Sequence, residues 1–286
     1  MNKVAIMADS ACCLPQELLQ HYDIYLLPLH VIYQGKSYRD GFDITPNEIY
    51  RIMRQKGDLP TTSTPSVGEF LQAYQQLSHK AESVVCITVT SLQSKTFEAA
   101  LLAKQMAAEA IPATTIEVFD SRAVAGALGF ITLEAAKAAS SGAGLAEVIE
   151  AARSIKDKVN AIFMLDTLYY LARTGRVARA AAWAGDTLNI KPVVEHSPAI
   201  GETTPLARPR DRAKGLEFIV KTMAERVGNA KVHAMVHHAD EQKEGDKLMK
   251  EIGSRFNCAE LYIVEFTPTM GVHCGPGMLG ITFYAD

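Results

Sequence analysis

Residues 83–119 contain the pattern that most limits the fold of this chain. A β-branched apolar run at 83–89 predicts a buried strand, an alanine-rich amphipathic segment at 96–110 predicts a helix, and a short apolar run at 116–119 predicts a second strand. A strand, a helix and a strand in this order normally form a parallel pair joined by a crossover. The chain is therefore expected to contain a parallel α/β sheet.

The same alternation extends along both halves of the 286-residue chain. A hairpin around Gln34-Gly35, within residues 25–40, interrupts it. Further helices are expected to start near 45–48 and to span 16–21, 69–77, 123–139, 145–154, 213–227 and 240–255. Further strands are expected at 4–8, 161–165, 193–194, 232–237, 261–266 and 280–284.

The length of the chain corresponds to about two domains, and the small and polar residues at 140–144 favour a loose connection. We expect an N-terminal α/β domain over residues 1–155, built on the parallel sheet and containing a small β excursion near 25–45. A C-terminal α/β domain is expected over residues 156–286, with a cleft between the two domains.

Composition argues against several classes of partner. The 29 Lys and Arg are balanced by 32 Asp and Glu, so nucleic acid is not an expected partner. The most lipid-like stretch, 123–139, contains Glu134 and favours a core helix over stable membrane insertion.

The cysteines and the N-terminal residues indicate the cellular compartment. The five cysteines include no CxxC pair, and the apolar run at 4–8 is too short for a signal peptide. We expect a cytoplasmic protein with reduced thiols.

Three loops that follow expected strands are rich in hydroxyl groups, at 9–10, 90–96 and 120–122. In an open parallel α/β sheet, ligands bind beyond the carboxyl ends of the strands. A single serine before a helix usually caps it, but the repetition favours a shared site. The loop at 90–96 also precedes a helix start, where free backbone N–H groups attract anions.

Two other segments favour the same kind of site. The turn at 60–66 places four hydroxyl groups between two prolines, which is more than helix capping explains. The tail at 273–277 reads HCGPG and places His273 in an expected loop, where Gly275 and Gly277 would let the backbone approach a ligand closely. A ligand contact and a packing role for His273 are equally compatible with these residues.

Nucleophilic catalysis is the main alternative to binding. Ser94, or in principle Ser63, paired with His273 could serve an acyl hydrolase or transferase. However, the sequence contains no GxSxG motif and no identifiable acid that would orient the imidazole.

Metal and nucleotide motifs are also missing from the sequence. The adjacent pairs His-His at 237–238 and His-Cys at 273–274 lack the spacing of metal ligands, and neither a Walker A nor a GxGxxG motif is present. Neither a metal nor a cofactor is therefore expected.

A series of ordered landmarks resembles the DegV family over nearly the whole chain. They are residues 9–11, 14–15, 62–66, 91–99, 120–121, 171–176, 188–192 and 273–277. Characterised bacterial members of this family are the fatty acid-binding subunits of fatty acid kinase. The resemblance implies a two-domain DegV-like α/β fold that buries one long-chain fatty acid between its domains and has no catalysis of its own. A separate ATP-dependent fatty acid kinase subunit would phosphorylate the carboxylate, giving an acyl phosphate for phospholipid synthesis.

The resemblance also implies which residues form the site. Hydrogen bonds from Thr62, Ser94 and His273 would hold the carboxylate. The full carboxylate-binding set comprises Thr62, Ser63, Ser94, Lys95, Thr96, His273 and Gly275. The partner-binding set comprises Arg173, Arg176, Arg208 and Arg210, with Arg173 expected at the surface near the pocket mouth.

Three positions depart from the family pattern. Lys95 occupies the position of a common glycine, Gln93 that of a leucine, and Thr64 that of a glutamine. Because Lys95 adds a cation beside the expected pocket, a carrier of another amphipathic anion remains an alternative to a carrier of fatty acid.

Overall fold

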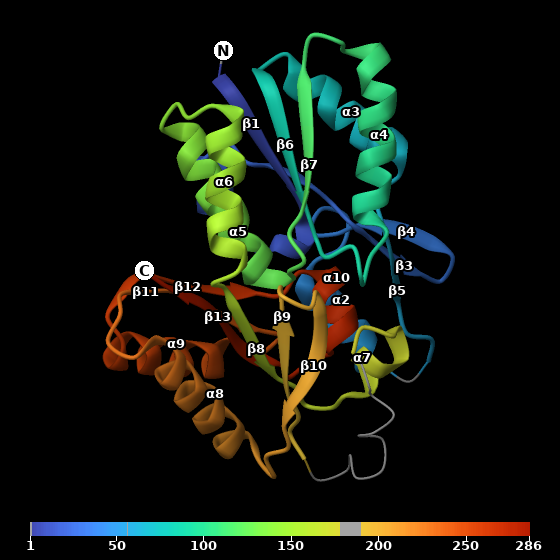
Figure 1. Cartoon of the computed structure of the whole chain (residues 1–286). Helices are drawn as coiled ribbons and strands as arrows, with labels where there is room; N and C mark the ends of the chain where they lie inside the picture. Colours follow the sequence, from blue (N-terminus) through green and yellow to red (C-terminus); the bar gives the residue numbers. More distant parts are fainter. Residues whose placement is uncertain (1, 56, 178–189) are drawn as a thin grey trace.

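The computed structural model describes residues 2–55, 57–177 and 190–286, which form two α/β units, each with its own sheet (Figure 1). Leu188 and Asn189, part of the landmark at 188–192, lie outside the described residues. The chain runs through one sheet before it enters the other, so the two halves of the sequence correspond to the two sheets.

The first sheet contains four parallel strands in the order β2-β1-β6-β7. Their bounds are β1 (Asn2–Asp9), β2 (Tyr25–Leu27), β6 (Ala81–Thr88) and β7 (Thr115–Asp120). The helix α4 (Thr96–Ala110) connects β6 to its parallel neighbour β7. The strand, helix and strand expected from the sequence are therefore confirmed.

Helices cover both faces of this sheet (Figure 1). The helices α3 (Val67–Ser78) and α4 pack on one face around Phe70 and Tyr74. The helices α5 (Ala125–Ser140) and α6 (Leu145–Lys156) cover the other face. Two short helices, η1 (Ser10–Cys12) and α1 (Gln16–His21), follow β1.

A three-stranded sheet, β4-β3-β5, extends from the first unit. The expected hairpin forms between β3 (His30–Tyr33) and β4 (Lys36–Arg39), and α2 (Pro46–Met53) follows it. The third strand, β5 (Thr61–Ser63), lies in the segment that we expected to be only a polar turn. Three residues are too few to show an alternating pattern, so the sequence does not predict this strand.

The second sheet is mixed and has six strands in the order β10-β9-β8-β13-β11-β12. Their bounds are β8 (Asn160–Met164), β9 (Val193–Ser197), β10 (Glu202–Ala207), β11 (Val232–His238), β12 (Cys258–Glu265) and β13 (Leu279–Ala285). The helices α8 (Arg212–Val227) and α9 (Gln242–Arg255) pack on it. The strand β10 was not expected from the sequence, because it contains Pro205. Proline is tolerated in a strand mainly at the edge of a sheet, and β10 is the edge strand of this sheet.

The helix α5 contacts both sheets. It packs against β1, β6 and η1 of the first unit and against β8 and β13 of the second. A methyl group on Gly126 would lie 2.3 Å from Thr282 Oγ1 of β13, and one on Gly129 would lie 2.6 Å from the carbonyl oxygen of Cys12 in η1. Only glycine permits these approaches, so α5 fits closely against both units.

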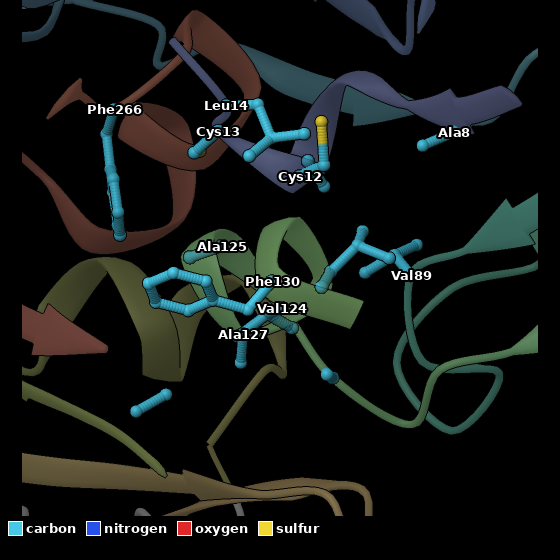
Figure 2. Close-up of a cluster of buried hydrophobic side chains, with 14 of the residues drawn as sticks. Ala8, Cys12, Cys13, Leu14, Val89, Val124, Ala125, Ala127, Phe130 and Phe266 are labelled. Carbon is cyan, nitrogen blue, oxygen red and sulfur yellow. The ribbon is translucent and has the colours of Figure 1, made fainter. Parts of the chain in front are cut away.

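The N-terminal end of α5 lies where side chains from both halves of the sequence meet. Figure 2 shows Val124 and Phe130 near Cys12 and Leu14, with Phe266 from the second half close by. Every residue of α5 from Ala125 to Leu133 is buried, which confirms the expected core helix. In the described chain, no helix combines the length and the apolar character that crossing a bilayer requires.

We expect Gly129→Ala to destabilise the protein by about 1–3 kcal/mol, because the added methyl group overlaps a backbone oxygen of η1. Gly68→Ala is the matched control, since the nearest atom to its added carbon is 3.9 Å away. Urea unfolding followed by circular dichroism measures both free energies of unfolding. Equal stability of Gly129→Ala and wild type would contradict the close contact between α5 and η1.

Candidate functional site

A cavity lies between the two sheets, at the carboxyl ends of the parallel strands. Its wall includes Ala11, Val89 and Val124, which follow β1, β6 and β7, together with Phe163 of β8 and Val194 of β9. Its empty volume, including the part open to solvent, is about 1140 Å³.

The wall combines a large apolar surface with a group of polar side chains. The apolar part consists of Ala11, Leu29, Val89, Val124, Phe163, Leu165, Leu171, Val194, Phe266, Met270 and Cys274. The polar part consists of Thr62, Ser63, Thr64, Gln93, Ser94, Lys95, Arg176, Thr203, Thr269 and His273. Such a wall suits a ligand with a long apolar body and one polar end.

His273 lies in a short helix, α10 (Pro268–Cys274), and not in the loop that we expected. The first turn of α10 is fixed by the buried Asp40, whose Oδ1 accepts the backbone N–H of Thr269 at 2.8 Å. Gly271 faces the ring of Tyr50 in α2, where an added methyl group would lie 2.8 Å from Cε1. Both contacts attach α10 to the N-terminal half and so position His273 beside β5.

The His273 imidazole is neutral. Burial lowers its pKa, and the nearby positive charge of Arg176 lowers it further, to about 3. Nε2 lies 3.1 Å from Thr62 Oγ1, whereas Nδ1 is buried and has no hydrogen-bond partner among the described residues. A neutral imidazole and a hydroxyl have two donor protons, and the bond between them uses one. The pair therefore has one donor left for a ligand.

Ser94 lies directly before α4 and forms part of the cavity wall. Its Oγ accepts the backbone N–H of Thr96 at 3.3 Å and lies 2.8 Å from Thr96 Oγ1. If the Thr96 hydroxyl donates to Ser94, the Ser94 proton is free to donate into the cavity. Thr96 is fully buried and does not line the cavity, so it supports Ser94 and does not face the ligand.

The remaining members of the expected carboxylate set differ in position. Ser63 lines the cavity, and its hydroxyl donates to the carbonyl oxygen of Thr64 at 3.2 Å. Lys95 lies at the rim, where its side chain is 78% exposed and its Nζ is 2.9 Å from Glu98 Oε1. Gly275 does not line the cavity: an added methyl group there would lie 2.2 Å from the ring of Tyr170. Its role is close packing.

The loops that follow β1 and β7 support the cavity and contribute little polar surface to it. Asp9 accepts the backbone N–H groups of Val89 at 2.7 Å and Ala11 at 3.0 Å, and burial raises its pKa to about 7. Asp120 accepts both the N–H and the hydroxyl of Ser91. Of the three hydroxyl-rich loops, only residues 90–96 place polar side chains in the cavity wall.

The four arginines of the expected partner-binding set differ in exposure and in their contacts. Arg173, in α7 (Tyr169–Thr174), is exposed and donates to the carbonyl oxygens of Leu59 and Pro60. Arg208 and Arg210 are exposed beyond β10, and both follow Thr203 of the cavity wall along the chain.

Arg176 differs from the other three, because it is half-buried and lines the cavity. The resemblance to the DegV family placed it in the partner-binding set, as part of the basic segment around Gly175. Gln93 and Thr203 also line the cavity. Gln93 belongs to the loop at 90–96 that was expected at the site, although it was not in the carboxylate-binding set, whereas no sequence pattern indicated Thr203. Among the described residues, no group of three or more His, Cys, Asp or Glu side chains could hold a metal ion.

Comparison with known proteins gives one family. A family model described as "Uncharacterised protein, DegV family" matches residues 3–286. Protein DegV of Bacillus subtilis is 30% identical over 97% of this chain and 98% of its own length. A solved structure described as fatty acid binding of a DegV family protein from Thermus thermophilus has a TM-score of 0.91 at 28% identity and covers 100% of both chains. A stearic acid-binding protein from Eubacterium ventriosum has a TM-score of 0.90 at 27% identity, covering 100% of this chain and 98% of that one. The expected two-domain DegV-like α/β fold is therefore confirmed.

We expect the His273 imidazole to remain neutral in the folded protein from neutral pH down to about pH 4, because its pKa is lowered from 6.5 to about 3. Within that window the unfolded chain binds a proton that the folded protein does not, so His273 lowers stability as the pH falls. Nitrogen-15 NMR of labelled histidine measures this pKa. It should rise in Arg176→Gln, and a wild-type value near 6.5 would contradict the burial of the ring.

Proposed function

The chain belongs to the DegV family, and from that premise we propose that it binds one long-chain fatty acid in the cavity between its sheets, without catalysis of its own. The observation that carries the proposal is the combination, in one cavity, of a large apolar wall with a hydrogen-bonding group built on Thr62 and His273. The described fatty acid and stearic acid binding of two similar structures supports the same class of ligand.

Donors at the polar part of the wall would satisfy the carboxylate. The Thr62–His273 pair has one free proton, and Ser94 can direct a second into the cavity. Each donor would compensate a carboxylate lone pair that is costly to bury without a partner. The head group would thus set the orientation of the ligand.

The apolar wall would supply most of the affinity. Burial of a methylene group is worth about 0.8 kcal/mol, so some 15 groups give roughly 12 kcal/mol before the costs of binding. Side chains from both sheets, such as Phe163, Val194 and Val89, would surround the tail. The match of tail and wall is the reason to propose a fatty acid and not a small organic acid.

The geometry favours binding over the acyl hydrolase alternative. A Ser-His nucleophile needs the serine hydroxyl on the imidazole and an acid behind it. Here Ser94 Oγ bonds to Thr96, His273 Nε2 bonds to Thr62, and no carboxylate among the described residues hydrogen-bonds to His273. A carrier of another anion has less support, because the ammonium of Lys95 is exposed and paired with Glu98.

We propose further that a separate ATP-dependent kinase subunit phosphorylates the bound carboxylate, in the cytoplasm and for phospholipid synthesis. Arg173 is the best candidate for a partner contact, because it is exposed and bonds to the segment that leads into β5 and Thr62. A partner that reaches the head group would therefore pass close to Arg173. Arg208 and Arg210 are further from the cavity along the chain and are weaker candidates.

We expect His273→Ala to weaken stearate binding by about 1.5–3 kcal/mol, which is the value of a hydrogen bond to a charged group. His79→Ala is the matched control, because His79 is exposed at the end of α3 and does not line the cavity. Isothermal titration with delipidated protein measures both affinities. If His273→Ala binds stearate as tightly as wild type, His273 does not contribute to carboxylate binding and has only a structural role.

We expect Arg173→Ala to retain stearate affinity and to lose most acyl phosphate formation by an added fatty acid kinase. The wild-type reaction should also slow as salt screens the charged contact. Arg255→Ala controls for loss of an exposed arginine, because Arg255 lies in α9 and pairs with Glu251. If binding and phosphorylation fall by the same factor, Arg173 acts on the ligand and not on the partner.

A further inference from the structure

One polar side chain of the cavity wall, that of Thr269, has no place in the head-group site proposed above. Thr269 lies in the first turn of α10, four residues before His273. Its side chain lines the cavity, although the residue is only 3% exposed. Four residues of an α-helix span about 6 Å, so Thr269 and His273 meet the cavity at points that are one turn of α10 apart.

The hydroxyl of Thr269 is buried and makes no hydrogen bond among the described residues. A threonine within a helix often donates to the carbonyl oxygen four residues before it, as Thr132 does in α5 and Thr222 does in α8. Thr269 has no such oxygen in its own helix, because α10 begins at Pro268. A buried hydroxyl without a partner is costly, so a partner from the cavity would be favourable.

The carboxylate of Asp40 lies near this hydroxyl and does not satisfy it. Asp40 Oδ1 accepts the backbone N–H of Thr269 at 2.8 Å, and Oδ2 accepts the hydroxyl of Ser10 at 2.5 Å. Burial raises the pKa of Asp40, these two bonds lower it, and the Thr269 hydroxyl lowers it least. No hydrogen bond of regular geometry joins that hydroxyl to Asp40, which does not line the cavity.

The wall on either side of Thr269 along the chain is apolar. Phe266 and Met270 both line the cavity, and Cys274 follows one turn after Met270. A saturated chain that runs along α10 from a head group at His273 would present only methylene groups to Thr269. A chain with a hydroxyl at that point would instead form a hydrogen bond, because a hydroxyl both donates and accepts.

We propose that the cavity accepts long-chain acids that carry a hydroxyl group near the carboxylate end of the chain, and that Thr269 recognises this hydroxyl. This inference rests on the proposed fatty acid binding and narrows its ligand class. The separation of roughly 6 Å between Thr269 and His273 corresponds to about five carbon–carbon bonds of an extended chain. The hydroxyl is therefore expected between about carbon 3 and carbon 7.

Positional isomers of hydroxystearate separate this hydrogen bond from the general cost of burying a hydroxyl. We expect wild type to bind one of the isomers substituted at carbons 3 to 7 about three-fold to ten-fold more tightly than 12-hydroxystearate. Thr269→Val removes the hydroxyl and should abolish this preference, whereas Thr269→Ser keeps the hydroxyl and should retain it. Stearate affinity should change by less than about two-fold in both variants, since stearate has no hydroxyl to recognise.

Displacement of a fluorescent fatty acid from delipidated full-length protein measures all of these affinities. Thr222→Val is the matched control, because it removes a buried threonine hydroxyl that does not line the cavity. Equal affinity of wild type for all isomers overturns the inference, and so does a preference that survives in Thr269→Val. An equal loss of stearate and hydroxystearate binding in Thr269→Val also overturns it, because Thr269 then acts only in packing. Failure of wild type to bind any of these acids overturns the proposed function itself.

Discussion

The position of the cavity depends on how closely α5 packs against both sheets. This helix is buried along its first half and has a glycine at each of two contacts, Gly126 against β13 and Gly129 against η1. Because a methyl group at either position would overlap its neighbour, α5 can approach both units this closely only with glycine at these two contacts. The residues that precede α5, including Val124, form cavity wall directly beside that contact. The same packing that joins the two units therefore defines one side of the ligand site.

The site itself combines a neutral hydrogen-bonding group with the guanidinium of Arg176, which has no acidic partner among the described residues. The Thr62–His273 pair and Ser94 provide donors without adding charge, since burial keeps the imidazole neutral. Two buried carboxylates, Asp9 and Asp40, hold the loops and the α10 helix that carry the site, and neither faces the cavity. An anionic head group would thus meet donors and the guanidinium of Arg176, with the acidic groups directed into the scaffold.

Sequence reasoning identified the long elements and the polar segments, and it failed where tertiary contacts decide the structure. The strands β1 and β6 are long apolar runs, and the loop at 90–96 lies at the carboxyl end of its strand as expected. In contrast, α10 has seven residues, too few for a helix that is stable alone, and its contacts with Asp40 and Tyr50 determine it. The inward position of Arg176 depends on the left-handed Gly175, which local composition does not reveal. The domain boundary between residues 155 and 156, within the last turn of α6, stays a prediction.

The central claim is that a fatty acid is bound with its carboxylate at the Thr62–His273 end of the cavity and its tail along the apolar wall. A crystal structure of the protein saturated with stearate tests this most directly. The account predicts one stearate per chain, with carboxylate oxygens within about 3.2 Å of donors from His273 or Thr62 and from Ser94, and with the tail beside Phe163 and Val194. A stearate in the reverse orientation, or bound outside this cavity, would contradict it.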